Sequence, residues 1–229
     1  MKVVVKPHRR MAGVYSVELE DGRTSLATLN LTLGRAVYRE RLIEAEDTEY
    51  RLWDPYKSKL AAAILKGLPS LPIKPGCSVL YLGAASGTTV SHVSDIIGAE
   101  GHIYAVEFSS RSLRELVSNI SLRKNVFPIL ADARSPWNYG FLVEKVDVIY
   151  CDVAQPEQAR LLADNADIFL KEEGSALLAI KARSVNSVKS PEKVFKEEVN
   201  VLKHRGLRVK TLIPLEPYDR DHAMVLAER

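Results

Sequence analysis

The chain has 229 residues, a length that fits one large domain, or one with a small appendage, and excludes a multidomain protein. Its composition, 46% hydrophobic and 27% charged residues, excludes a disordered chain. Its 32 Lys and Arg against 29 Asp and Glu give a net charge of +3, a bias compatible with nucleic acid but too weak to identify it. Two cysteines, Cys77 and Cys151, exclude a disulfide framework and a cysteine-rich zinc site, and we expect no metal site.

Residues 1–53 are predicted to form a small N-terminal β domain. Apolar and polar residues alternate over residues 13–19, a turn follows, and two more strands are expected over residues 25–33 and 36–43. The pattern changes at Asp54, which with Pro55 is typical of a helix start, and apolar residues then recur at helical spacing. We therefore expect a domain boundary here, with the second domain over residues 54–229.

From residue 75 onward the pattern alternates between strands and helices. The expected strands are residues 79–82, 102–108, 126–130, 146–151 and 176–180, and the expected helices are residues 88–97, 110–122, 156–170 and a segment opened by Ser190 and Pro191. This alternation predicts an α/β fold, a Rossmann-like, mostly parallel sheet with helices on both faces. The last strands, residues 207–215 and 223–227, follow one another without a helix, which indicates an antiparallel C-terminal hairpin.

A turn of small residues follows the first strand of the predicted sheet, where ligands usually bind in this fold. Gly83 and Gly87 allow a ligand to approach the backbone closely, and the helix that begins at Thr88 directs free amide groups at it. The dinucleotide pattern GxGxxG is absent, because Ala85 lies between the two glycines. A purely structural tight turn would explain this stretch as well.

Acidic residues end three successive strands of the predicted sheet. Glu107 lies at a strand end, where a carboxylate can bind both hydroxyls of an adenosine ribose, and Asp132 and Asp152 end the next two strands. Each alone could be a helix cap or a solvated loop residue, but three on one rim favour a binding site. Phe108 stacks on an adenine or packs in the core.

Three stretches of the sequence resemble the fibrillarin family: residues 81–95 (YLGAASGTTVSHVSD), residues 50–55 with 58–62 (YRLWDP and SKLAA) and residues 220–225 (RDHAMV). The similarity extends over nearly the whole chain. Eukaryotic fibrillarins carry a glycine- and arginine-rich extension that is missing here, so we expect the shorter archaeal form. The resemblance implies a class I methyltransferase fold and an S-adenosylmethionine-dependent 2′-O-methyltransferase of ribosomal RNA and, in archaea, transfer RNA, within box C/D ribonucleoprotein particles.

The resemblance also assigns residues to the cofactor. Those around its methionine part are Gly83, Ala84, Ala85, Gly87, Thr88 and Thr89. Glu107 would hold the ribose, and the adenine would be framed by Phe108, Asp132 and Ala133. The residues that close the site beside the methyl group are Asp152, Val153, Ala154 and Gln155.

A Lys-Asp-Lys-His set is implied for catalysis, and the candidates are Lys59, Asp152, Lys181 and His222. A ribose 2′-hydroxyl is a weak nucleophile, so it must be placed in line with the methyl group and lose its proton. Burial beside a second cation makes a lysine release its proton more readily, so we expect Lys181 as general base and Lys59 as its neighbouring cation. Asp152 would orient the ammonium group or the ribose, and His222 would position Lys181 or relay a proton.

Structural interpretations of these residues stay open at this point. A lysine that ends a buried strand usually extends to solvent, Lys59 fits a solvated helix face, and His222 fits a polar position in the hairpin. The histidines are scattered singly, and we expect His92, on the helix after the glycine turn, to be structural.

RNA and two proteins are the expected partners. Residues 181–210 carry nine Lys or Arg and three Glu, which suits phosphate contacts or a solvated helix face. The chain has no base-reading motif, and the resemblance implies instead that a box C/D guide RNA pairs with the target ribosomal or transfer RNA. It also implies that the enzyme docks on a Nop-domain scaffold protein, through the N-terminal β domain or the outer helices, and that a kink-turn-binding ribosomal-type protein completes the particle.

Two other functions fit the same residues. A nicotinamide-dependent oxidoreductase is favoured by Glu107 and opposed by the missing GxGxxG pattern, and a structural subunit of an RNA particle could keep the cofactor pocket without turnover. For location, charges and Pro7 interrupt the apolar amino terminus, and the charge-free residues 75–94 are too rich in Gly, Ser and Thr to span a membrane. We therefore expect a soluble, cytoplasmic protein.

Overall fold

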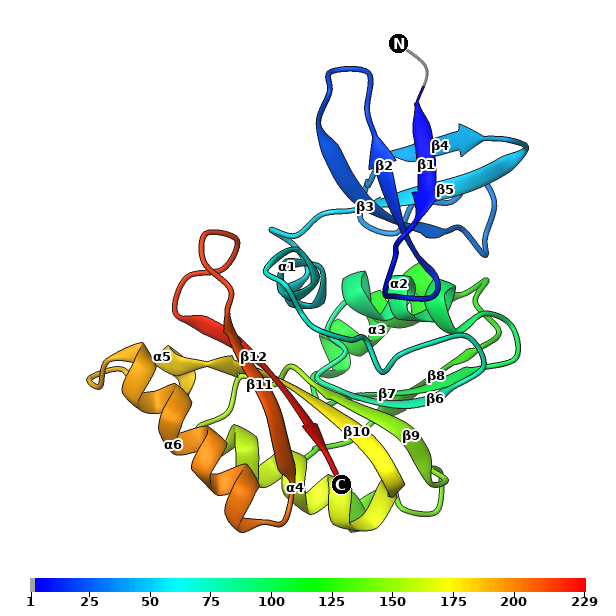
Figure 1. Cartoon of the computed structure of the whole chain (residues 1–229). Coiled ribbons are helices and arrows are strands. Elements are labelled where there is room, and N and C mark those ends of the chain that lie inside the picture. Colours follow the sequence, from blue (N-terminus) through cyan, green and yellow to red (C-terminus); the bar gives the residue numbers. More distant parts are fainter. Residues whose placement is uncertain (1–2) are drawn as a thin grey trace.

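The computed structural model describes residues 3–229 and contains two β-sheets (Figure 1). The first sheet has five antiparallel strands in the order β1-β2-β3-β5-β4. Its strands are β1 (Val4–Pro7), β2 (Val14–Glu18), β3 (Thr24–Leu29), β4 (Leu42–Ala45) and β5 (Thr48–Trp53). The strand expected over residues 13–19 is therefore β2. The strand expected over residues 25–33 is β3, which ends earlier, at Leu29.

The strand expected over residues 36–43 is wrong. Its first six residues form no strand, because the Glu40 carboxylate accepts hydrogen bonds from the backbone N–H groups of Val37 and Tyr38, at 2.9 and 2.7 Å, and closes this segment into a loop. Only the last two of the expected residues lie in β4. The sequence prediction also missed β1 and β5.

The second sheet has seven strands in the order β11-β12-β10-β9-β6-β7-β8. They are β6 (Ser78–Leu82), β7 (His102–Glu107), β8 (Val126–Leu130), β9 (Val146–Cys151), β10 (Leu170–Lys181), β11 (Arg208–Pro214) and β12 (His222–Glu228). The five strands from β10 to β8 are parallel, whereas β12 runs antiparallel to both β10 and β11. The predicted α/β sheet with its C-terminal antiparallel hairpin is confirmed.

Helices cover both faces of this sheet. They are α1 (Lys59–Leu65), α2 (Thr88–Ile97), α3 (Ser110–Ile120), α4 (Gln158–Phe169), α5 (Ala182–Val185) and α6 (Pro191–His204). Because side chains alternate along a strand, Val79 and Tyr81 of β6 pack in the core under α1, α2 and α3, while Leu80 and Leu82 pack in the core under α4 and α6. This arrangement leaves the carboxyl ends of the parallel strands open at one rim.

Two helices begin later than expected. Ser58 caps α1 through a hydrogen bond from the Ala61 N–H to its hydroxyl, and Asp54 instead accepts the Tyr56 N–H in a turn before the helix. The helix expected to begin at Pro156 begins at Gln158. The correction at α1 matters for function, because it makes Lys59 the first residue of that helix.

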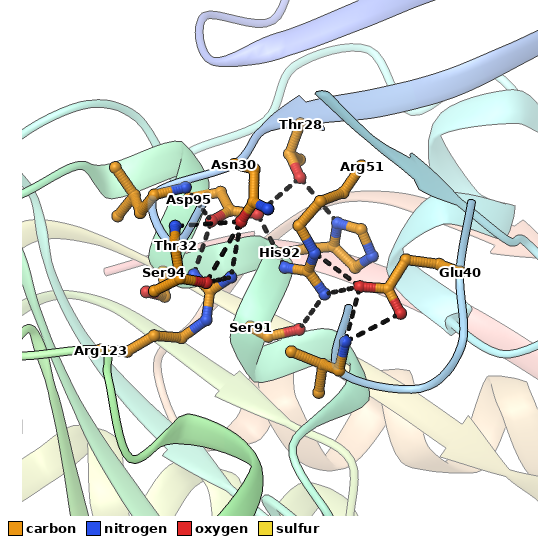
Figure 2. Close-up of polar contacts among 12 residues, drawn as sticks. Thr28, Asn30, Thr32, Glu40, Arg51, Ser91, His92, Ser94, Asp95 and Arg123 are labelled. Atoms are coloured by element: carbon orange, nitrogen blue, oxygen red, sulfur yellow. Dashed lines mark hydrogen bonds and ion pairs between the residues drawn. The ribbon is translucent and has the colours of Figure 1, made fainter. Parts of the chain in front are cut away.

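A buried ionic network joins the first sheet to α2, which lies between the two sheets (Figures 1 and 2). The Arg51 side chain from β5 is fully buried and forms ion pairs with Glu40 and with Asp95 of α2, at 2.5 and 2.8 Å. It also donates to the Ser91 hydroxyl at 2.8 Å. Arg123 approaches Asp95 from the segment before β8, at 2.5 Å. The network therefore connects three segments that are distant in the sequence.

His92 is buried beside this network and is structural, as expected. Its Nδ1 lies 2.7 Å from the Thr28 hydroxyl, its Nε2 lies 2.8 Å from the Tyr38 hydroxyl, and its ring stacks on Trp53. Burial, with the nearby charges of Arg51 and Arg123, holds the pKa of His92 well below its usual value. A neutral imidazole thus bridges the first sheet and α2.

The two sheets share apolar packing. Met11, Val14, Leu26 and Trp53 belong to the same buried cluster as the helices on one face of the second sheet. The division at residue 54 separates two sheets, and the assignment of residues 1–53 and 54–229 as domains stays a prediction. In the part of the chain that the structure describes, no helix is long and apolar enough to cross a membrane.

Candidate functional site

A cavity of about 330 Å³ lies at the carboxyl ends of β6, β7, β8 and β9, a volume that suits a small organic ligand. Ten of the residues assigned to the cofactor by resemblance line it: Gly83, Ala85, Glu107, Phe108, Asp132, Ala133, Asp152, Val153, Ala154 and Gln155. Four others, Ala84, Gly87, Thr88 and Thr89, lie outside this lining. The structure thus brings most of the predicted cofactor residues together at one rim.

A larger groove of about 710 Å³ adjoins this cavity and shares Gln155 and Leu161 with it. Its lining includes none of the four catalytic candidates, as far as residues 3–229 are concerned. The smaller cavity is therefore the candidate site, because Asp152 and Lys181 both line it.

The glycine turn requires its two glycines. Gly83 has a φ of +84°, and a Cβ there would lie 2.8 Å from the backbone oxygen of Asp152. Gly87 has a φ of +94°, and a Cβ would lie 2.6 Å from the side chain of Leu116. Ala85 adopts a φ of +48°, which is uncommon for a residue other than glycine. At Gly83 two backbone segments approach too closely for a side chain, whereas at Gly87 it is the positive φ that favours glycine.

Glu107 holds the turn in this conformation. One carboxylate oxygen accepts the Ala85 N–H and the other accepts the Ser109 N–H, both at 2.9 Å. Each oxygen keeps a further acceptor site, so the carboxylate can still bind the two ribose hydroxyls predicted from the sequence. Glu107 therefore combines a structural contact with a position on the cavity wall.

The predicted adenine residues differ in exposure. Phe108 is 67% exposed at the rim, so the alternative that it packs in the core is wrong. The Asp132 carboxylate forms an ion pair with Arg134 at 2.5 Å, and the hydrogen bond from Arg134 lowers the pKa of Asp132. Ala133 is buried and lines the same cavity. An exposed aromatic ring and a fixed carboxylate thus border the same cavity.

Lys59, Asp152 and Lys181 form a cluster beside the cavity. Lys181 Nζ lies 2.9 Å from Asp152 Oδ1, and Lys59 Nζ lies 3.3 Å from the same oxygen. These contacts are ion pairs, and the directed hydrogen bond of Lys181 goes to the backbone oxygen of Asp152 at 3.0 Å. All three side chains are less than one fifth exposed. The solvent-exposed interpretations of Lys59 and Lys181 are therefore wrong.

His222 joins this cluster through the sheet. It is the residue directly opposite Lys181 where β12 pairs with β10. Its Nδ1 lies 2.9 Å from Asp219 Oδ1, and Asp219 Oδ2 lies 3.7 Å from Lys59 Nζ. Sequence reasoning missed Asp219, although it precedes the family-like RDHAMV stretch by one residue. The structure thus gathers all four catalytic candidates and adds a fifth polar residue to them.

Part of the basic segment 181–210 is neutralised within the protein. Lys189 pairs with Glu197, Arg205 pairs with Asp164 and Asp167, and Arg208 pairs with Glu228. Such surface pairs are typical of a solvated helix face. A role for this segment in phosphate binding stays a prediction.

Comparison with known proteins gives consistent matches. The fibrillarin family model matches residues 5–229. A fibrillarin-like rRNA/tRNA 2′-O-methyltransferase of Staphylothermus marinus is 55% identical over 225 residues, 98% of this chain and 96% of that protein.

Two solved structures extend this similarity to three dimensions. Aeropyrum pernix fibrillarin, crystallised with natively bound S-adenosyl-L-methionine, is 53% identical with a TM-score of 0.93, and 99% of each chain is covered. The fibrillarin of a crystallised fibrillarin/Nop5p complex is 42% identical with a TM-score of 0.86, and 98% of this chain and 100% of that chain are covered. With a family model matched almost from end to end and relatives this similar, the chain belongs to the fibrillarin family.

Proposed function

We propose that this chain transfers the methyl group of S-adenosylmethionine to ribose 2′-hydroxyl groups of ribosomal and transfer RNA. The expected enzyme class and cofactor are confirmed by the relatives, which include a named rRNA/tRNA 2′-O-methyltransferase and a fibrillarin with bound S-adenosyl-L-methionine. The observation that carries the proposal is the cluster of Lys59, Asp152 and Lys181 at the edge of the cavity.

The residues of the cavity fit this cofactor. Glu107 would hold the ribose, Phe108 and Asp132 would border the adenine, and the turn between Gly83 and Gly87 would surround the methionine part. The Asp152 to Gln155 segment would lie beside the methyl group, next to the lysine cluster. When bound, the cofactor supplies a methyl group on a sulfonium, whose sulfur is a good leaving group.

The lysines would prepare the ribose hydroxyl. Neutral Lys181 Nζ would accept the proton of the ribose hydroxyl, and the cofactor would supply the methyl group to the ribose oxygen, its sulfur leaving with the electron pair of the carbon–sulfur bond. The cation of Lys59, which shares Asp152 with Lys181, would polarise the hydroxyl. Asp152 keeps both lysines in place, so the oxygen can be held in line with the methyl group.

Target choice would come from outside the chain. We infer that a box C/D guide RNA pairs with the target, that a Nop-domain scaffold protein holds the enzyme and that a kink-turn-binding protein completes the particle. The solved fibrillarin/Nop5p complex supports a scaffold of this kind. Its docking surface would lie on residues 1–53 or on the outer helices.

Calorimetric titration of the isolated chain with S-adenosylmethionine, beside NAD, tests the cofactor first. Saturable binding of S-adenosylmethionine alone is expected, and binding of NAD alone would contradict the proposal. The particle is then assembled with guide RNA and partner proteins, and methyl transfer is measured to a target with or without the 2′-hydroxyl. Transfer to the first target only is expected, whereas cofactor binding without any transfer would identify a structural subunit.

Replacing Asp132 with Ala is expected to weaken S-adenosylmethionine binding about tenfold, because the adenine border loses a carboxylate that can accept hydrogen bonds. The dissociation constant is measured by the same titration. Asp167→Ala is the matched control, since Asp167 pairs with Arg205 on the outer face of α4. Equal affinities of the wild type and Asp132→Ala would show that the adenine assignment is wrong.

A further inference from the structure

The carboxyl end of β10 extends beyond that of its neighbour β9. The last paired residues of the two strands are Leu178 and Cys151, but β10 continues to Lys181. After Cys151 the chain leaves the sheet through residues 152–155, which line the cavity. Lys181 therefore lies at a strand end that β9 no longer pairs with.

Gln158, the first residue of α4, takes the place of the missing strand partner. Its side chain is fully buried, and its Oε1 accepts the Lys181 N–H at 2.9 Å. The next N–H along the chain, that of Ala182, donates to the backbone oxygen of Asp221 at 3.0 Å, on the β12 side. Because successive N–H groups of a strand point to opposite edges, the Lys181 N–H points to the β9 side, where the Gln158 carboxamide meets it.

The other end of the same carboxamide is unsatisfied. Gln158 Nε2 is buried and has no hydrogen-bond partner among residues 3–229. The carboxamide cannot be turned around, because a backbone N–H donates and only Oε1 can accept. A buried donor without an acceptor destabilises a fold, so the burial of Gln158 is explained by the contact of its Oε1 with Lys181 and not by a gain in stability at Nε2.

The position of Gln158 is itself fixed by another helix. The carboxylate of Glu198, which is buried on α6, accepts the Ala159 N–H at the start of α4 at 2.7 Å. From the backbone held by Gln158, the Lys181 side chain reaches Asp152, with Nζ 2.9 Å from Oδ1 and 3.0 Å from the backbone oxygen. The contacts thus run from α6 through α4 to the end of β10.

We propose that Gln158 is a positioning residue for methyl transfer: it holds the backbone of Lys181 where β9 and β10 diverge, so that the Lys181 side chain meets Asp152 at the cavity. The inference rests on the proposed function. In the part of the chain that the structure describes, Gln158 is absent from the cavity lining, so it acts through Lys181 and not on the cofactor.

Gln158→Met tests this role, because methionine has a similar length but no atom that replaces the Oε1 acceptor. Single-turnover methyl transfer by the assembled particle should fall about tenfold, since small displacements of a reacting group are costly. The dissociation constant of S-adenosylmethionine should stay within about twofold of the wild type. The melting temperature should change by less than roughly 4 °C, because the variant loses one buried hydrogen bond and also removes one unpartnered donor.

The same substitution in a Lys181→Ala background separates positioning from a general structural role. Lys181→Ala keeps the backbone N–H but has no side chain to position. Adding Gln158→Met should therefore slow the residual transfer by less than about twofold, since one residue acting through another gives non-additive effects. A second tenfold loss in this background would overturn the inference.

Asn125→Leu is the matched control. Asn125 is also a buried carboxamide, but its Nδ2 donates to the backbone oxygens of Ser94 and Gly98, at 3.0 and 2.8 Å, just before β8 begins and away from the rim. At a temperature where both variants are folded, its transfer rate should stay within about twofold of the wild type. An equal loss in both variants would show that any lost buried carboxamide slows the enzyme, and the role of Gln158 would fall.

Hydrogen exchange of the Lys181 backbone amide in the free chain needs no transfer assay. The wild-type amide should be protected, and in Gln158→Met it should exchange at least about tenfold faster. Fast exchange in the wild type, or unchanged protection in the variant, would overturn the inference. A wild type that binds S-adenosylmethionine and protects this amide but transfers no methyl group in the assembled particle would instead contradict the proposed function, and with it the role of Gln158.

Discussion

Replacing Lys181 with Ala is expected to slow methyl transfer by at least about a hundredfold, because the variant lacks the proposed general base. The affinity for S-adenosylmethionine should change little, since Lys181 borders the cavity beside Asp152 and the residues predicted to bind the adenosine come from other strands. Single-turnover transfer with the assembled particle gives the first quantity, and calorimetry gives the second.

Two further variants separate proton transfer from charge. Lys181→Arg keeps a cation beside Asp152, but a guanidinium does not release its proton at neutral pH, so we expect a loss similar to that of Lys181→Ala. Lys171→Ala removes a half-exposed lysine from the opposite end of β10, where it pairs with Asp147, and should leave transfer unchanged. An active Lys181→Arg would show that Lys181 acts as a charge and is not the general base.

Replacing Arg51 with Met is expected to lower the free energy of unfolding by about 3–5 kcal/mol, because the carboxylate of Glu40 stays buried without its cation. For a chain of this length the melting temperature should fall by roughly 10 °C. Urea denaturation at neutral pH measures the change. Arg23→Met is the control, since its pair with Asp21 is largely exposed and is worth at most about 1 kcal/mol.

The direction in which acidic pH changes this stability difference can also be predicted. Burial raises the pKa of Glu40, but Arg51 and the N–H groups of Val37 and Tyr38 lower it further, so the net shift is downward. The part of the free energy of unfolding that depends on this lowered pKa is fully present at pH values above the ordinary carboxyl pKa. It is lost as the pH falls through the lowered pKa of the folded protein. The difference between the wild type and Arg51→Met should therefore narrow on acidification, and a constant difference would contradict this account.

A rescue variant tests the mechanism directly. In the Arg51→Met background, Glu40→Gln removes the uncompensated charge and keeps an oxygen that can accept the N–H groups of Val37 and Tyr38. Part of the lost stability should return. If Glu40→Gln lowered stability further, loss of packing by the arginine, and not its charge, would explain the effect.

Local sequence patterns were sufficient to predict most of the strands and helices of the parallel sheet. The predicted bounds of α2, β8 and β9 agree with the structure, because these segments combine a clear apolar period with Gly, Pro or polar residues at their ends. In the first sheet, β5 carries Glu49 and Arg51 and lacks such a pattern. Its charges are satisfied by α2 and by the loop around Glu40, partners that no local window contains.

The candidate site was likewise predicted only in part from the sequence. Strands that alternate with helices place their carboxyl ends on one rim, so the sequence alone determined the α/β fold and where a cofactor would lie, and the fibrillarin-like stretches determined the expected chemistry. Only the tertiary structure decided which residues meet there. Because β12 inserts between β10 and β11, His222 lies opposite Lys181, and Asp219 reaches both His222 and Lys59. Such contacts depend on long-range strand pairing, and the order of strands in a sheet is set by the packing of the whole chain and not by any local pattern.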